Sequence, residues 1–329
     1  MGQKSIFAAL LLPLAACAAP GTNPVTGGDG VDGTEDPTAN DAIVRYEPSD
    51  GEGSGYATGY AYDEGTDTFT VDNLAFDGDN TYTAEDDPDI IANIPFAVYE
   101  NASVFNDSTT GVPITQFPHK IIYGVSTNTD GDGNPTTEFA IVRTGAYLGY
   151  GFGGFLYQRG GGVTLPTTGQ ADYTGQYAAL RDFDGMTGLE FATGDMNVSI
   201  DFEDFDTGDA AQGTVTNRQI FDIDGNDITA SMITALQTEY GGTYAALPTL
   251  TFNVGPGVLD SAGELQGTLS SYLVDGDGDT QQFESGNYYA LLSGDGADEI
   301  VGVLVVEADD PRYTNVTVRE TGGFILYRP

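Results

Sequence analysis

The sequence predicts an all-β protein. Three observations carry this prediction. Gly supplies 46 of the 329 residues, and aromatic residues, all Tyr or Phe, supply 11%. Short segments rich in Thr, Val, Tyr and Phe lie between Gly, Asp and Asn, which is typical of many short strands joined by turns. Helical spacing is confined to Ile228 to Tyr240 and would end at Gly241 and Gly242, so we expect at most one short helix.

The expected strands follow alternating apolar and polar residues between turn residues. In the first region they cover 56–62, 68–76, 94–99, 120–125, 137–143 and 149–158. In the second half they cover 171–178, 195–202, 212–218, 249–254, 264–272, 280–284, 287–292, 299–307 and 322–327. Since no helices are available to support a parallel sheet, this second half is predicted to form a closed antiparallel barrel or a sandwich.

The first residues have the pattern of a bacterial lipoprotein signal. Lys4 precedes the apolar run 6–12, and Leu14 to Cys17 look like a lipobox. Such a run is too short to span a bilayer and is typical of a secretory signal. We therefore expect cleavage after residue 16 and a lipid on Cys17, the only cysteine; the alternative is an ordinary signal with an incidental cysteine. Ala18, rather than Asp, favours the outer membrane over the inner one, with the surface or periplasmic face left open.

The chain is predicted to have four parts. Residues 1–16 form the signal peptide, and 17–41, rich in Gly, Pro, Asp and Thr, form a flexible tether. Residues 42–162 form the N-terminal β domain, and 165–329 form the second β domain after a break at 160–162. With Cys17 acylated, the mature chain has no thiol for disulfides, nucleophilic catalysis or metal binding.

The charge is strongly acidic. The chain has 50 acidic and 10 basic residues, and removal of the signal peptide with Lys4 leaves nine basic residues. Such a surface repels phosphate backbones, which argues against nucleic acid as a partner. It suits cations, basic proteins, or solubility in a salty habitat.

Several segments resemble one family in order along the chain. They are 165–177, 195–202, 213–217, 286–289, 297–305 and 323–328. Together they are similar to the β-barrel domain of transferrin-binding protein B and related surface lipoproteins. The resemblance implies an eight-stranded antiparallel barrel packed with side chains, preceded by a handle-like β domain. The chain has one barrel rather than two lobes, so transferrin contacts cannot be carried over, and relatives with this barrel bind different ligands.

Three acidic segments are weak calcium candidates, because alternating carboxylates place oxygens on one side of a tight loop. Two supply the candidate ligands Asp222, Asp224 and Asn226, and Asp275, Asp277 and Asp279; the third runs from Asp130 to Asn134. None completes an EF-hand, since the twelfth positions are Ile233 and Gly286. Plain turns are the alternative, because Asp and Gly are common turn residues. No other cofactor is expected.

His119 is the only histidine and would have to serve any Ser-His-Asp triad, but no serine has a nucleophile-elbow context. As a haem ligand one imidazole would suffice; a loop histidine with neither role is the simpler interpretation. Glycoside hydrolysis needs a pair of carboxylates, but with 50 acidic residues some pair will always lie within reach. Such a pair is therefore no evidence for this activity.

These observations predict a binding protein rather than an enzyme. We expect a lipid-anchored outer-membrane protein that captures an unknown protein or small ligand, such as an iron carrier or haem, through loops on a rigid barrel. The alternative is a structural acidic envelope lipoprotein with weak calcium-binding turns.

Overall fold

The computed structural model describes residues 31–48, 55–75, 77, 81–85, 90–91, 94–102, 104–106, 109–203, 211–253 and 258–329. The predicted signal peptide, Cys17 and the tether up to residue 30 lie outside these residues. None of the helices in the described part of the chain has the length and apolarity that crossing a membrane requires.

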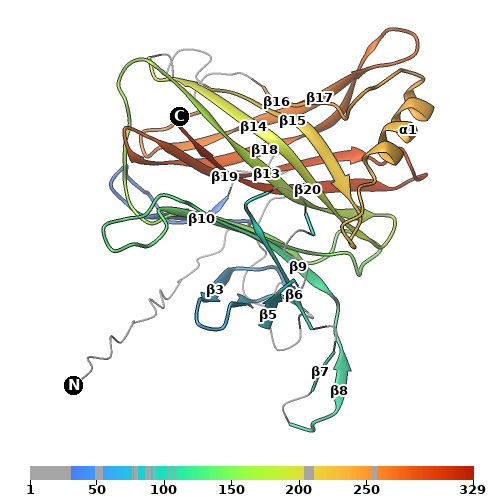
Figure 1. Cartoon of the computed structure of the whole chain (residues 1–329), viewed down its shortest axis with the longest axis horizontal. Helices are drawn as coiled ribbons and strands as arrows, with labels where there is room; N and C mark the ends of the chain where they lie inside the picture. Colours follow the sequence, from blue (N-terminus) through green and yellow to red (C-terminus); the bar gives the residue numbers. More distant parts are fainter. Residues whose placement is uncertain are drawn as a thin grey trace.

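The second half of the chain is a closed eight-stranded antiparallel barrel, as the resemblance implied (Figure 1). Its strands are β13 (Gln170–Asp184), β14 (Leu189–Asp201), β15 (Ala211–Phe221), β16 (Leu250–Phe252), β17 (Glu264–Val274), β18 (Thr280–Asp295), β19 (Glu299–Asp309) and β20 (Thr317–Tyr327). Each strand from β13 to β20 pairs with the next, and β13 pairs with β20 to close the ring. Closure leaves this sheet without free edges along most of its length.

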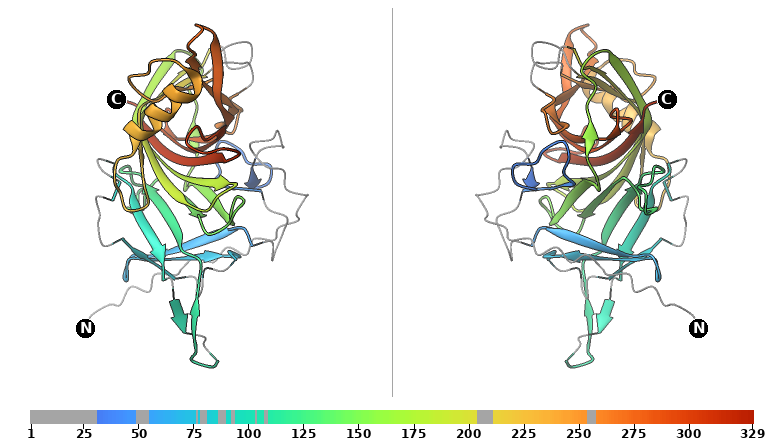
Figure 2. Two further views of the ribbon diagram at one scale, coloured as in Figure 1. Left: turned by 90° about the vertical axis from the view of Figure 1, so that its right-hand side faces the viewer. Right: turned by 90° about the vertical axis from the view of Figure 1, so that its left-hand side faces the viewer.

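The first half is a curled nine-stranded sheet that lies against one side of the barrel (Figures 1 and 2). In chain order its strands are β1 (Asp32–Gly33), β2 (Ile43–Tyr46), β3 (Gly59–Asp63), β4 (Thr68–Asp72), β5 (Thr81–Ala84), β6 (Ala97–Asn101), β9 (His119–Val125), β10 (Thr137–Thr144) and β11 (Gly153–Arg159). A separate hairpin, β7 (Val104–Asn106) with β8 (Pro113–Thr115), projects from it. The strand β12 (Val163–Thr164) pairs in parallel with the end of β18.

The predicted helix is α1 (Thr229–Tyr240), between β15 and β16. Met232 and Leu236 are buried in the same apolar cluster as the barrel interior, so the helix packs its apolar side there. Gly241 follows with a φ of 70°, the left-handed conformation that commonly ends a helix and favours glycine.

Alternate residues of the barrel strands bury two separate faces. On β13, Tyr173, Tyr177 and Ala179 belong to a cluster that includes residues from all eight strands, which places them inside the barrel. Ala178 and Leu180 belong instead to a cluster with residues of the N-terminal sheet. The period of two along a strand therefore gives the barrel a filled interior and an apolar outer side that carries the first half of the chain.

Two sequence predictions are corrected by the structure. The strands expected at 280–284 and 287–292 are one strand, because Gly286 stays paired with Leu269 on β17 and with Val306 on β19. A side chain at Gly286 would overlap the backbone of β19, so this glycine permits a close strand approach rather than a break.

The second correction concerns residues 31–41, which we expected to be the end of the tether. Asp32 pairs with Tyr46, and the N–H of Val163 donates to the carbonyl of Ala39 over 2.7 Å. Because backbone partners hold this segment against the folded part, the ordered chain begins by residue 31. Composition alone missed this, since β1 has only two residues.

A substitution at Gly323 on β20 tests the contact between the N-terminal sheet and the barrel. A Cβ at this position would overlap the ring of Phe139 on β10. We expect Gly323→Ala to lower the free energy of unfolding by about 1–3 kcal/mol, the usual cost of overpacking. Urea unfolding measures this cost, which should shrink in a Phe139→Leu background; an equal cost in both backgrounds would contradict the close contact.

Candidate functional site

The acidic segments form turns of one construction. In the turns that begin at Asp130, Asp222, Asp260 and Asp275, Oδ1 of the first Asp accepts the N–H groups of the second and fourth residues after it. The third residue after each Asp is glycine with a φ between 81° and 89°. Only this residue needs the left-handed conformation, so the pattern Asp-x-x-Gly-x sets the turn.

The first carboxylate of each calcium candidate is therefore occupied by its own turn. Asp222 also accepts Asn226 Nδ2 at Oδ2 over 2.9 Å, and Asp275 accepts Gln281 Nε2 at Oδ2 over 2.9 Å. These donors lower the pKa of both carboxyls, with the Asn226 and Gln281 side chains as the largest causes.

The remaining candidates are exposed side chains of the same turns. They are Asp224, Asn226, Asp277 and Asp279. Within the described ranges no three His, Cys, Asp or Glu side chains group as a metal site would require. The structure brings each triplet into one turn, and calcium binding there stays a prediction.

A matched pair of variants tests the role of the turn that begins at Asp275. Asp275→Ala removes the acceptor of two backbone N–H groups, so we expect a lower melting temperature in calcium-free buffer. Asp277→Ala, at an exposed position, should leave it unchanged. Thermal melting with and without calcium checks both; a calcium-dependent rise that both variants lose would establish the calcium loop instead.

His119, at the start of β9, is fully buried. Its Nδ1 lies 3.0 Å from the carbonyl oxygen of Phe117, and its Nε2 has no partner among the described residues. Burial lowers the pKa of the ring to about 4, so it is neutral at neutral pH. No hydroxyl or carboxylate binds the ring in the described part, and full burial gives it no access to a haem.

This buried ring predicts a pH-dependent stability. The pKa is about 6.5 in the unfolded chain and about 4 in the native one. The unfolded chain therefore binds the proton first as pH falls, and we expect about 3 kcal/mol of stability to be lost between pH 6.5 and 4. Urea unfolding across this range measures it, with His119→Gln as the control. Identical slopes in both proteins would contradict the buried neutral ring.

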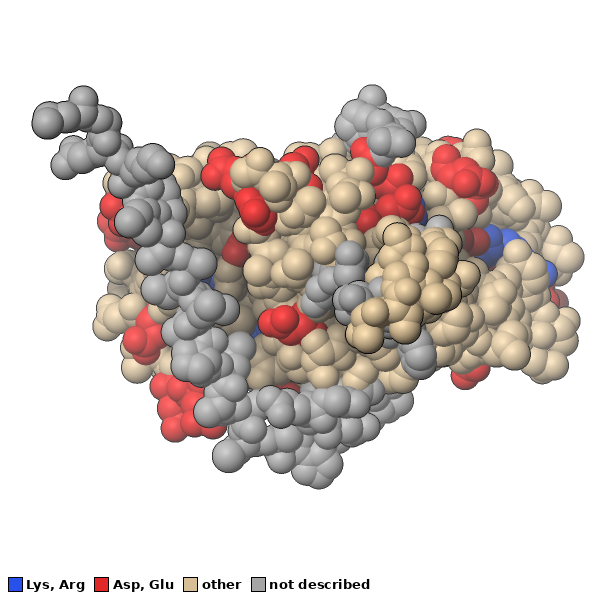
Figure 3. All heavy atoms as spheres, turned by 90° about the horizontal axis from the view of Figure 1, so that it is seen from below, with Lys and Arg blue, Asp and Glu red and all other residues tan. Residues whose placement is uncertain are grey.

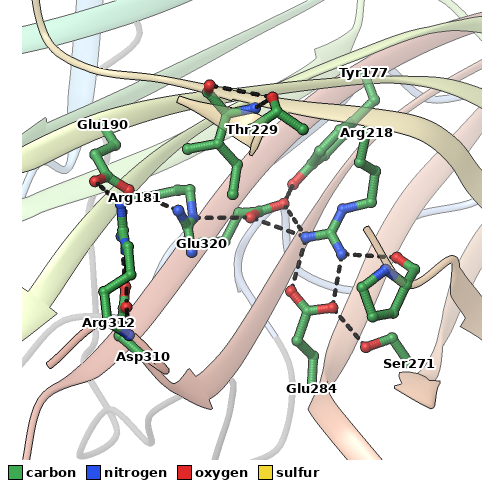
Figure 4. A network of polar contacts seen from close by, with 12 residues as sticks. Tyr177, Arg181, Glu190, Arg218, Thr229, Ser271, Glu284, Asp310, Arg312 and Glu320 are labelled. Carbon is green, nitrogen blue, oxygen red and sulfur yellow. Dashed lines mark hydrogen bonds and ion pairs between the residues drawn. The ribbon is translucent and has the colours of Figure 1, made fainter. Parts of the chain in front are cut away.

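The barrel interior contains a network of ion pairs (Figure 4). Arg218 binds Glu284 through two bonds of 2.7 Å and also binds Glu320 over 3.0 Å. Glu320 accepts the hydroxyl of Tyr177 over 2.9 Å and lies 3.2 Å from Arg181. Burial alone would raise the pKa of Glu320, but the Arg218 and Arg181 guanidiniums hold it below its usual value.

The network continues to the barrel rim through Glu190. Arg181 binds Glu190 over 2.6 Å, and Arg312 binds the other Glu190 oxygen over 2.7 Å. Arg312 also binds Asp310 over 2.5 Å. Paired charges and apolar side chains therefore occupy this part of the barrel interior.

Nearly all the positive charge of the described chain is internal. The other buried cations are Arg45 with Glu264, Lys120 with Glu85 and Glu100, Arg143 with Glu47, Arg319 with Asp182, and Arg159 with the carbonyl of Leu292. Of the nine basic residues in the described ranges, Arg328 alone is exposed. Figure 3 shows acidic side chains across one face with little blue among them.

One end of the barrel gathers the connections that follow β13, β15, β17 and β19. Successive connections of an antiparallel barrel alternate between its two ends, so the turns at Asp222 and Asp275 share this end with the loop after Asp309. This exposed acidic end is the candidate binding surface.

Comparison with known proteins gives structural likeness only. No protein-family model matches the sequence, and no curated protein matches it. The structure resembles transferrin-binding protein B. A transferrin-binding protein B of Haemophilus parasuis is 12% identical at a TM-score of 0.36, over 70% of this chain and 37% of that one. That of Neisseria meningitidis is 12% identical at a TM-score of 0.33, over 71% and 42%.

A crystal structure described as a surface lipoprotein is 12% identical at a TM-score of 0.30, over 63% of this chain and 81% of that one. This chain thus spans less than half of the two transferrin-binding protein B chains. Scores this low support no inference about a ligand, and the barrel is established by its own strand pairing.

The interior network was missed by sequence reasoning. Its signal was available in the period-two register. Arg181 shares a strand face with Tyr177 and Ala179, and Glu320 shares one with Phe324 and Leu326. A charged residue in such a register must find a buried partner, but the sequence did not indicate which carboxylate would meet which guanidinium.

Proposed function

We propose that this chain is a lipid-anchored binding protein of the outer membrane, which captures an unknown protein or small ligand through the loops of its barrel. The predicted lipid on Cys17 supplies the anchor, and a second acyl chain would make it stable. The barrel supplies a rigid support, on which exposed loops are the usual place for recognition.

The location of the cations is the observation that carries this proposal. Seven of the nine described cations are buried, and Arg312 is paired with Glu190 and Asp310. We therefore assign recognition to exposed loops, whose charge is acidic. Such loops attract cationic surfaces and repel phosphate backbones. We therefore infer a partner that presents basic or uncharged groups, and no nucleic acid.

A binding role is favoured over a catalytic one by the state of the candidate groups. His119 is buried and neutral. The first carboxylates of the acidic turns hold their own backbone N–H groups. Neither is arranged to move a proton to or from a bound substrate.

Protease treatment of intact cells tests surface display. Proteinase K should release the folded part by cutting the predicted tether, so cell-associated protein disappears while a periplasmic control survives. Trypsin should not release the folded part, because residues 18–30 contain no Lys or Arg. The other cationic side chains are buried or paired, and Arg328 is followed by Pro329. Immunodetection of cells and medium gives the readout.

Two results would contradict the proposal in different ways. Protection from proteinase K on intact cells, with digestion after the outer membrane is opened, would place the chain on the periplasmic side and favour the acidic envelope role. Growth with labelled palmitate that leaves the chain unlabelled, while Cys17→Ser still fractionates with membranes, would remove the lipid anchor.

A further inference from the structure

The β17–β18 hairpin extends beyond the barrel ring. Its two strands pair with each other as far as Val274 and Thr280, whereas β18 pairs with β19 only from Ser285 onward. On its other side, β17 pairs with β16 at Leu269 and Ser270. Residues 272–283, which we call the hairpin tip, therefore stand out from the ring beside α1 (Figure 1).

The hairpin tip is braced by the end of α1. The N–H of Gly276 donates to the carbonyl of Tyr240 over 2.8 Å, and the hydroxyl of Tyr244 donates to the carbonyl of Val274 over 2.9 Å. The rings of Tyr240 and Phe283 meet edge to face at 6.2 Å, and Phe283 belongs to the apolar cluster of the barrel interior. Since these contacts fix the tip in advance, binding to it loses little conformational entropy.

The outer face of the hairpin tip is uncharged and partly apolar. Tyr272 is 51% exposed and Val274 53%, whereas Leu273 between them is buried in the barrel interior. Gln282 stands opposite Tyr272, and Thr280 opposite Val274, and directly opposite residues of an antiparallel pair share a face. Of the large apolar side chains that are exposed in the described ranges, Tyr272 and Val274 alone stand two residues apart on one strand.

Carboxylates border this face. Asp277 and Asp279, in the turn that follows Val274, are exposed. The sequence has no Lys or Arg between Arg218 and Arg312, and both of these guanidiniums bind carboxylates of the barrel. The hairpin tip therefore offers an apolar centre beside negative charge that the neighbouring chain does not neutralise.

We propose that the outer face of the hairpin tip is a docking site for a protein partner that presents an apolar group bordered by Lys or Arg. This rests on the proposed binding function and names the part of the acidic barrel end that makes the contact. A tyrosine on a rigid support is a common anchor at the centre of a protein interface. Charged groups around such a centre chiefly speed association and select the partner.

Charge favours such a partner over a second copy of this chain. The formal charge of the chain is −40, and most of its exposed charged side chains are acidic. A second copy would therefore bring further carboxylates to Asp277 and Asp279, and like charges at a contact oppose binding. A basic protein surface is attracted by the same carboxylates.

Two labelled peptides of equal charge probe this face. One has four Arg around a Leu-Phe centre, and the other has the same four Arg around a Gly-Ser centre. The full lipidated chain is held in micelles of non-ionic detergent, and fluorescence anisotropy gives the Kd of each peptide, with empty micelles as the blank. We expect the Leu-Phe peptide to bind about tenfold more tightly, since it alone fills the apolar centre.

The apolar centre is tested by Tyr272→Ser. This variant should bind the two peptides equally, because the anchor for the Leu-Phe centre is gone. The matched control is Val125→Ser on β9, where the native side chain is 40% exposed; it should keep the tenfold preference. Both positions are exposed, so neither change is expected to prevent folding.

The acidic border is tested by Asp277→Asn. It should weaken both peptides about threefold at low salt and have no effect at high salt, where exposed charges are screened. Asp132→Asn removes an exposed carboxylate from the same position of the turn that begins at Asp130. This control changes the net charge equally and should leave both affinities unchanged.

Three results would overturn the proposal. Equal affinities of the parent chain for both peptides would show that charge alone attracts them. Equal effects of Tyr272→Ser and Val125→Ser would show that the outer face of the hairpin tip makes no particular contact. A dimer seen by light scattering that Tyr272→Ser dissociates would show that a second copy covers this face.

Failure of this proposal is distinguishable from failure of the proposed function. A chain that proteinase K releases from intact cells, but that binds both peptides equally, would be displayed without docking through the hairpin tip. A chain that stays protected on intact cells, but prefers the Leu-Phe peptide through Tyr272, would lose its surface display and keep this docking site.

Discussion

Positive charge is scarce in this protein and is held almost entirely in its interior. Glu320, Glu284 and Glu190 lie inside the barrel, and Arg218, Arg181 and Arg312 neutralise them there. Removing one partner of such a buried pair commonly costs about 3–5 kcal/mol, against a net stability of about 5–15 kcal/mol for a typical domain. The filled barrel therefore depends on these guanidiniums, and the surface is left with the unpaired carboxylates.

Buried ion pairs and apolar contacts also join the two halves of the chain. Between them lies an apolar layer that includes Phe139 and Ile141 of the sheet and Val303 and Ile325 of the barrel. Around it Arg143 binds Glu47 and also donates to Thr321 on β20, and Arg45 binds Glu264 on β17. Buried Glu299 at the start of β19 accepts Asn128 and Thr136 over 2.8 and 2.9 Å. Apolar burial and specific polar contacts together make the N-terminal sheet and the barrel one rigid support.

Local patterns predicted most of the elements. Alternation located the hairpin of β3 and β4, the strands β9 and β10, and the barrel strands, and helical spacing located α1 within a residue of its start. The strand expected at 299–307 is β19, and both of its faces are buried. Val301, Val303 and Val305 pack with the N-terminal sheet, and Ile300, Leu304 and Val306 pack in the barrel interior.

What failed depends on contacts distant in sequence. Gly286 looked like a break because its partners on β17 and β19 could not be known. Whether the Asp-rich turns bind calcium stays a prediction, because ligand spacing and turn spacing use the same residues; Oδ1 of Asp222 and Oδ1 of Asp275 accept N–H groups of their own turns. Residues 31–41 looked like tether, although their partners on β2 and after β11 order them.

The internal location of the cations is tested most directly by labelling arginine in the native protein with phenylglyoxal and mapping the sites by mass spectrometry. The sequence contains eight arginines. The account predicts rapid labelling of Arg328 alone in the folded chain and of all eight after unfolding. Rapid labelling of Arg181, Arg218 or Arg319 in the folded chain would contradict it, since these side chains would then be open to solvent and the carboxylates beside them unpaired.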